Sequence, residues 1–185
     1  WDSVFATRSL GRTGKYYFET YINRDDGANG MPSAIHETDT ANKNWAHYIG
    51  NTTATYGLGY GLYSHAGYYT NGGGNSIVGY ATAGPMAAGD IAMMAVDLDN
   101  SKIYWGKNGT FFNSGDPANN TGESATIQAN TDYIFGVSPP STEDYFVNFG
   151  ADSTFGGAIS AGGNSDSRGV GDFKYAVPTG FLSLA

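Results

Sequence analysis

The acidic side chains are the first candidates for catalytic residues. A retaining glycoside hydrolase needs two carboxylates about 5 Å apart, one as nucleophile and one as acid. Glu19 is the only acidic residue in its predicted strand, Lys15–Ile22. The other glutamates fall in predicted loops: Glu37, Glu123 and Glu143. Asp97 and Asp99 could share a face, but they lie at a predicted hairpin, where Asp side chains bond the turn backbone. We therefore expect no catalytic residues and no enzyme activity.

The sequence also gives little support for a metal site or a catalytic nucleophile. The run Asp97-x-Asp99-Asn100-Ser101 carries oxygen ligands at alternating positions, as calcium loops do. The distal Glu of such a loop is absent, because Thr110 and Phe111 occupy that region, so a turn is favoured over a calcium site. Cysteine is absent and the three histidines are far apart, with no G-x-S-x-G elbow. We expect no metal and no other cofactor.

One tyrosine-rich segment does resemble a recognition surface. The stretch Ser64–Ser76 reads SHAGYYTNGGGNS, and Tyr combined with Gly, Asn and Ser is typical of antibody paratopes. We predict a binding loop here with exposed Tyr68 and Tyr69. The loop Ser138–Asp144 is the second candidate for the binding site. Alternate tyrosines nearby could instead pack the core: Tyr56, Tyr60 and Tyr80. The candidate ligand-binding residues are Tyr63, His65, Tyr68, Tyr69, Asn71 and Asn75.

Short strands must position these loops. Aromatic residues make up 15% of the chain, charged residues only 14%, and there are 28 glycines, which favours strands joined by tight turns over helices. Ile91–Leu98 is almost entirely apolar, so it is expected to be a central strand buried on both faces. Ala151–Asp172 reads as a long Gly- and Ser-rich excursion. The remaining predicted strands are Tyr56–Tyr63, Ile77–Thr82, Lys102–Trp105, Tyr133–Val137, Tyr145–Phe149 and Gly180–Leu184.

Three blocks, in the correct order, resemble the SPRY group of concanavalin A-like folds. Gly14–Glu19 reads GKYYFE and matches the opening strand of that group. Gly89–Thr110 matches its "G-D, apolar strand, D, turn, strand, K-N-G" signature, and Val147–Gly150 reads VNFG. With Tyr133–Pro139 and Pro178–Phe181, the matches extend over residues 14 to 182. The continuation after Asn148 looks closer to SPRY-like proteins of tailed phages than to animal signalling modules.

The resemblance implies one all-β domain over residues 1–185, a two-sheet antiparallel β-sandwich of the concanavalin A-like jelly-roll type. It also implies framework roles for the motif residues, because the fold carries no shared catalytic site. Asp97 would accept hydrogen bonds from the turn that follows it, and the Asn148 amide would hold a neighbouring loop. We expect the domain to be part of a longer chain, since Trp1 and Ala185 both lie close to predicted strands.

The charge balance limits the partners. Nine basic against 17 acidic residues give a net charge of −8, which disfavours nucleic acid and anionic membranes. No apolar run is long enough for membrane insertion. We expect a binding or structural module at a virion or extracellular surface, which recognises a protein or glycan on a host or on a neighbouring virion subunit and which could form a homo-oligomer. The alternatives are a free-standing carbohydrate-binding lectin and, more weakly, a glycoside hydrolase.

Overall fold

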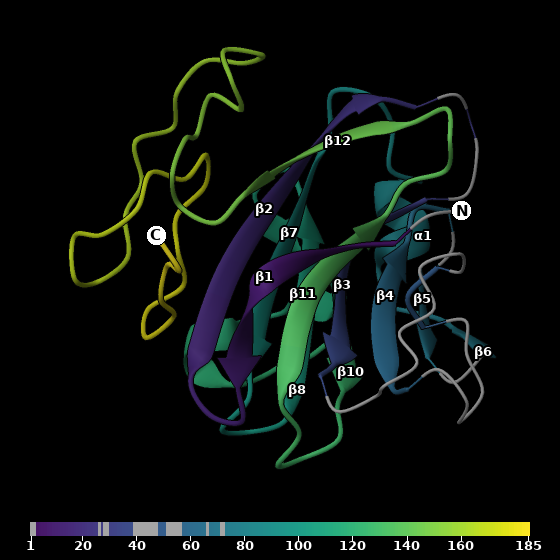
Figure 1. Ribbon diagram of the computed structural model, residues 1–185, viewed down its shortest axis with the longest axis vertical. Coiled ribbons are helices and arrows are strands. Elements are labelled where there is room, and N and C mark those ends of the chain that lie inside the picture. Colours follow the sequence, from purple (N-terminus) through teal and green to yellow (C-terminus); the bar gives the residue numbers. More distant parts are fainter. Residues whose placement is uncertain are drawn as a thin grey trace.

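Two antiparallel sheets packed face to face form the body of the protein (Figure 1). The computed structural model describes residues 3–25, 27, 30–38, 48–50, 57–65, 67–70 and 73–185. The first sheet has the strand order β1 (Val4–Gly11), β11 (Tyr133–Ser138), β3 (Met31–Glu37), β4 (Gly59–Tyr63), β5 (Gly67–Thr70) and β6 (Gly73–Asn75). The second has the order β10 (Ala125–Thr126), β8 (Lys102–Lys107), β7 (Ile91–Asp97), β2 (Lys15–Arg24) and β12 (Asp144–Asn148), with β9 (Thr110–Phe111) also paired to β8. The predicted β-sandwich is confirmed.

The predicted strand Ile77–Thr82 is wrong. This segment forms a turn and the short helix α1 (Tyr80–Ala83) instead. Gly79 and Gly84 flank the helix with φ of 81° and 76°, and such left-handed backbone interrupts an extended strand. Two short 3₁₀ turns, Phe112–Ser114 and Pro117–Asn119, complete the helical content of the described residues.

Strand β7 is buried on both faces, as its continuous apolar sequence predicts. Because side chains alternate along a strand, Ala92, Met94 and Val96 enter the core between the sheets. Ile91, Met93 and Ala95 enter a second apolar cluster on the outer face of the second sheet. A sandwich of two sheets alone would leave that outer face in water, so a third layer must cover it.

Residues 151–185, here called the C-terminal layer, provide that cover and run from green to yellow beside β2 and β12 in Figure 1. Phe155, Phe173 and Phe181 are its buried anchors against the outer face. The layer is irregular, and the predicted strand Gly180–Leu184 is reduced to one parallel bridge between Leu182 and Tyr16. Phe181 is fully buried in the second cluster, and its neighbour Leu182 accepts a hydrogen bond from the Tyr17 N–H at 3.1 Å and donates one to the Lys15 carbonyl at 2.9 Å, both on β2.

Polar side chains fix the C-terminal layer to the sandwich. Asn148 is 3% exposed, and its Oδ1 accepts hydrogen bonds from the N–H groups of Gly150, Ala151 and Asp152 at 2.8, 2.8 and 3.2 Å. Its Nδ2 donates to the carbonyl of Asp172 at 2.8 Å. The predicted role of the Asn148 amide as the anchor of a loop is therefore confirmed.

A buried carboxylate makes a second attachment. Glu19 on β2 accepts hydrogen bonds from the backbone N–H groups of Lys174 and Tyr175, both at 2.8 Å, and from the Tyr17 hydroxyl at 3.0 Å. Burial raises the pKa of Glu19, and these hydrogen bonds offset the rise only in part. Glu19 is thus a structural acceptor on the covered face of the sheet.

Candidate functional site

The turn between β4 and β5 is built on Ser64. Its buried Oγ accepts a hydrogen bond from the Gly30 N–H at 3.1 Å and shares another with His65 Nδ1 at 2.9 Å. The Ser64 N–H donates to the Gly30 carbonyl at 3.0 Å, and the Ser64 carbonyl accepts from the Met86 N–H at 2.8 Å. These bonds hold Tyr63 and His65 in place at one end of the sandwich.

The second candidate segment, Ser138–Asp144, lies against the same glycine. The Tyr145 hydroxyl donates to the carboxylate of Glu143, and both groups stand where a side chain at Gly30 would be. Burial, and then the hydrogen bond and negative charge of Glu143, raise the pKa of Tyr145 above its usual value. Gly30 therefore brings together two segments that the sequence offered as separate alternatives.

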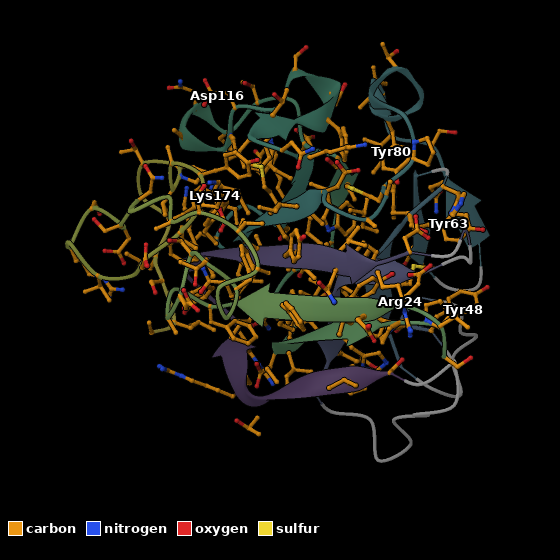
Figure 2. The ribbon with its side chains drawn as sticks, turned by 90° about the horizontal axis from the view of Figure 1, so that it is seen from above. Arg24, Tyr48, Tyr63, Tyr80, Asp116 and Lys174 are labelled. Atoms are coloured by element: carbon orange, nitrogen blue, oxygen red, sulfur yellow. The ribbon has the colours of Figure 1, made fainter. Side chains whose placement is uncertain are left out.

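We call this surface the loop end and define it as Arg24, Gly30, Tyr63–His65 and Glu143–Tyr145. Figure 2 places Arg24, Tyr63 and Tyr80 on one side of the molecule, opposite Lys174 of the C-terminal layer. Arg24 Nε and the Asp144 carboxylate are 3.5 Å apart, and both side chains are about half exposed. The Tyr80 hydroxyl donates to the Tyr63 carbonyl at 2.7 Å. The loop end thus combines aromatic, imidazole and charged groups on a fixed backbone.

The candidate residues at the start of the segment fit a binding surface. Tyr63 and His65 are partly exposed, with ring centroids 5.9 Å apart. Asn75 is exposed, and its Nδ2 donates to the Gly73 carbonyl at 3.2 Å. Tyr69 lies on β5, and Asn71 lies outside the described residues. No contact with a ligand tests these assignments, so they stay predictions.

Two structural expectations for this segment are wrong. Ser64–Ser76 is not one loop, because β5 and β6 occupy most of its described residues and extend the first sheet. Tyr68 is only partly exposed, since its ring packs on Trp105 with centroids 5.4 Å apart. Tyr68 stands opposite Leu62 on the inward face of the sheet, and this pairing overrides the flexibility that its glycine neighbours suggest.

Catalytic arrangements are poorly supported by this geometry. Ser64 and His65 are hydrogen-bonded, but the Ser64 hydroxyl is buried and already accepts the Gly30 N–H. The two buried glutamates are well separated, because Glu19 pairs with Asn148 whereas Glu143 adjoins the pair Asp144–Arg24. Five residues of β2 separate these positions, which is roughly 17 Å. Carboxylates of glycosidases are at most about 9.5 Å apart.

The predicted turn at Asp97 is confirmed. Its Oδ1 accepts from the Asn100 N–H at 3.0 Å, its Oδ2 accepts from Asn100 Nδ2 at 2.8 Å, and Lys15 Nζ lies 2.8 Å from Oδ2. Asp99 accepts the Gly14 N–H at 2.8 Å. These oxygens are bound to protein donors, and the described residues contain no cluster of three or more His, Cys, Asp or Glu side chains suited to a metal ion.

Sequence reasoning missed the contribution of Gly30 and Arg24 to the loop end. The pair Asn29-Gly30 signals a turn in the sequence but not a contact with Tyr145, and only the packed position of Tyr145 reveals why a side chain is excluded at Gly30. Arg24 lies at the end of β2, beyond the apolar run that marks the strand.

Within the described part of the chain, no helix is long and apolar enough to span a membrane.

Comparisons with known proteins bear on the fold. No family model matches the sequence, and no curated protein does either. Solved structures do match: the SPRY domain of human HERC1 is 15% identical, with a TM-score of 0.53, and the match covers 78% of this chain and 80% of that one. This neighbour agrees with the two antiparallel sheets of the structure. The chain therefore has a SPRY-like β-sandwich fold.

Proposed function

We propose that this chain is a non-catalytic binding module that recognises a protein or a glycan through its loop end. The observation that carries the proposal is the convergence of two separate segments on Gly30, which fixes Tyr63 and His65 at the rim of a rigid sandwich. Rigid aromatic groups lose little entropy on binding, and recognition commonly lies on loops supported by a scaffold. The SPRY-like β-sandwich supplies such a scaffold, with the loop end at one end of its sheets.

A photocrosslinking experiment tests the loop end directly. A photoreactive amino acid placed at Arg24, which is about half exposed, should trap a specific partner in the cells or particles that contain the protein. The double variant Tyr63→Ala/His65→Ala, with the photoreactive group still at Arg24, should lose that partner. The matched control carries the photoreactive group at Thr126, which is exposed on β10. Equal trapping from both positions would refute recognition by the loop end.

A lectin is the second candidate, because tyrosine rings also stack on sugar faces and the loop end presents Tyr63 beside His65. Binding of the purified protein to a glycan array, lost in the Tyr63→Ala/His65→Ala variant, would select this candidate. A reducing-sugar release assay addresses the glycoside hydrolase alternative, for which the separation of Glu19 and Glu143 predicts no turnover.

We also propose a location at a virion or extracellular surface, in a phage tail, fibre or capsid-decorating protein. The support comes from the sequence alone. The insert after Asn148 is rich in Gly and Ser, the fraction of charged residues is low, and the net charge is negative. Electron microscopy of particles labelled with an antibody to this domain would test it. The absence of label from particles that contain the gene would reject this location.

A further inference from the structure

Among the described residues, the outer strands of the two sheets are not equally protected. Proteins commonly shorten, bulge or cover edge strands to prevent pairing with other chains. At the edges, β6 has three residues and β10 has two, while β1 has two breaks in register. In contrast, β12 is regular from Tyr145 to Asn148 and carries Phe146, which is 40% exposed. Strand β12 is therefore the edge best suited to accept another strand.

The outward backbone groups of β12 follow from the alternation of antiparallel pairing. Ile22 uses its N–H and carbonyl on the β7 side, with Asp90 at 2.9 Å and Gly89 at 2.8 Å. Its partner on β12, Tyr145, must then direct its own N–H and carbonyl away from β2. The same holds two residues later for Val147, opposite Thr20. No described residue bonds these four groups.

A groove runs beside this edge on the outer face of the sheet. Phe146 and Phe155 both lie against Tyr21, with ring centroids 6.3 and 5.7 Å from it. The groove encloses about 460 Å³ and is lined by residues 145–148, Ala151, Asp152, Phe155 and Gly156. Because every second side chain of an added strand would point to this face, the groove can hold an apolar side chain between the two phenylalanines.

Charge indicates the chemistry of the added strand. None of the residues that line the groove is basic, and Asp152 stands among them. Hydrogen bonds from Thr154 and from the Gly156 N–H hold the pKa of Asp152 below its ordinary value, so it stays ionised near neutral pH. Asp144, at the start of β12, is paired with Arg24. A Lys or Arg two residues from the apolar residue would point to the same face and meet this carboxylate at Asp152.

The same charge argues against a second copy of this chain at the edge. Each copy carries a net charge of −8, and pairing β12 with itself would bring two acidic grooves together. Like charges across an interface oppose association. A basic segment of another protein is favoured instead.

We propose that β12 binds an extended segment of another protein, which adds as a strand beside Tyr145 and Val147. This strand places an apolar side chain in the groove between Phe146 and Phe155 and a Lys or Arg, two residues away, beside Asp152. Main-chain hydrogen bonds would provide affinity and the groove would provide selectivity. The site shares Tyr145 with the loop end, but it uses the outward backbone groups of that residue, whereas the loop end uses its hydroxyl. It does not depend on the function proposed for the loop end.

The probe is a set of peptides of about ten residues, selected from a random display library against the whole protein. We expect basic peptides with alternating apolar residues. Phe146→Ala should weaken their binding about tenfold or more, since it removes one wall of the groove. Val147→Pro should do the same by removing an outward N–H, because proline is tolerated on edge strands. Val4→Ala is the matched control, at a residue 57% exposed on the β1 edge.

An N-methyl scan of the best peptide tests strand addition without altering the protein. Methylation should abolish binding at every second position and be tolerated at the others. Uniform sensitivity, unchanged binding to both β12 variants, or a selection that yields no peptide would overturn the proposal. Self-association that disappears in Phe146→Asp would also overturn it, in favour of a second copy. The Tyr63→Ala/His65→Ala variant should bind the peptide normally, which separates this site from the loop end.

Discussion

The substitution Asn148→Ala should detach the start of the C-terminal layer from the sandwich. The buried amide accepts three backbone N–H groups and donates to one carbonyl, and alanine replaces none of these bonds. A net value near 1 kcal/mol for each hydrogen bond gives a loss of about 4 kcal/mol in the free energy of unfolding. For a domain of this size, that corresponds to a fall in melting temperature of roughly 8–16 °C.

Urea denaturation and thermal unfolding, followed by circular dichroism, measure this loss. Hydrogen exchange should locate it, because the amides of Gly150, Ala151 and Asp152 lose their acceptor in the variant. Asn75→Ala is the matched control: Asn75 is exposed and makes a single bond to Gly73, so its loss should stay within about 0.5 kcal/mol. If Asn148→Ala costs less than about 1 kcal/mol, the amide does not anchor the layer and the reasoning fails.

Three further predictions concern the core, acid stability and the loop end. Tyr68→Ala should destabilise the protein by about 2 kcal/mol in urea denaturation, because the half-buried ring packs on Trp105; an unchanged midpoint would restore the exposed-loop interpretation. Burial disfavours ionisation of Asp166, but hydrogen bonds from Arg168 and from the Ser183 N–H outweigh it and lower its pKa, so its stabilisation is present above an ordinary pKa of about 3.9 and is lost as pH falls below it. Asp166→Asn should therefore be less stable at pH 7 and show a shallower decline in acid; parallel pH profiles for the two proteins would contradict this. Gly30→Ala should separate Tyr145 from Glu143, which ultraviolet difference spectra of the tyrosine would detect, and an unchanged spectrum would count against the packing described at the loop end.

The framework was predictable from the sequence because its signals are local. The apolar run Ile91–Leu98 predicts a strand buried on both faces, and Asp97 before Asn100 predicts a turn. Asn148 between Val147 and Phe149 must point away from their face, and this places its amide beneath the following loop. Each of these inferences needs only the alternation of a strand or the chemistry of a turn.

The loop end and the β12 groove were harder to predict from the sequence because they depend on contacts between distant segments. The glycines around Tyr68 suggest a flexible loop, but pairing of Tyr68 with Leu62 turns its ring toward Trp105. Nothing near Gly30 in the sequence indicates that Tyr145 occupies the space beside it. The exposure of Phe146 similarly follows from the edge position of β12, which only the strand order reveals.

The position of the C-terminal layer has a consequence for synthesis on the ribosome. The outer face of β2 is complete once Arg24 has emerged, but its cover includes Phe173, about 150 residues later, or roughly 8–30 s at usual elongation rates. Once Met93 and Tyr104 have also emerged, they form with Tyr17 an apolar surface that stays in contact with water until the cover is complete. Nascent chains stalled between Gly150 and Phe173 should consequently be the species that recruit chaperones or aggregate.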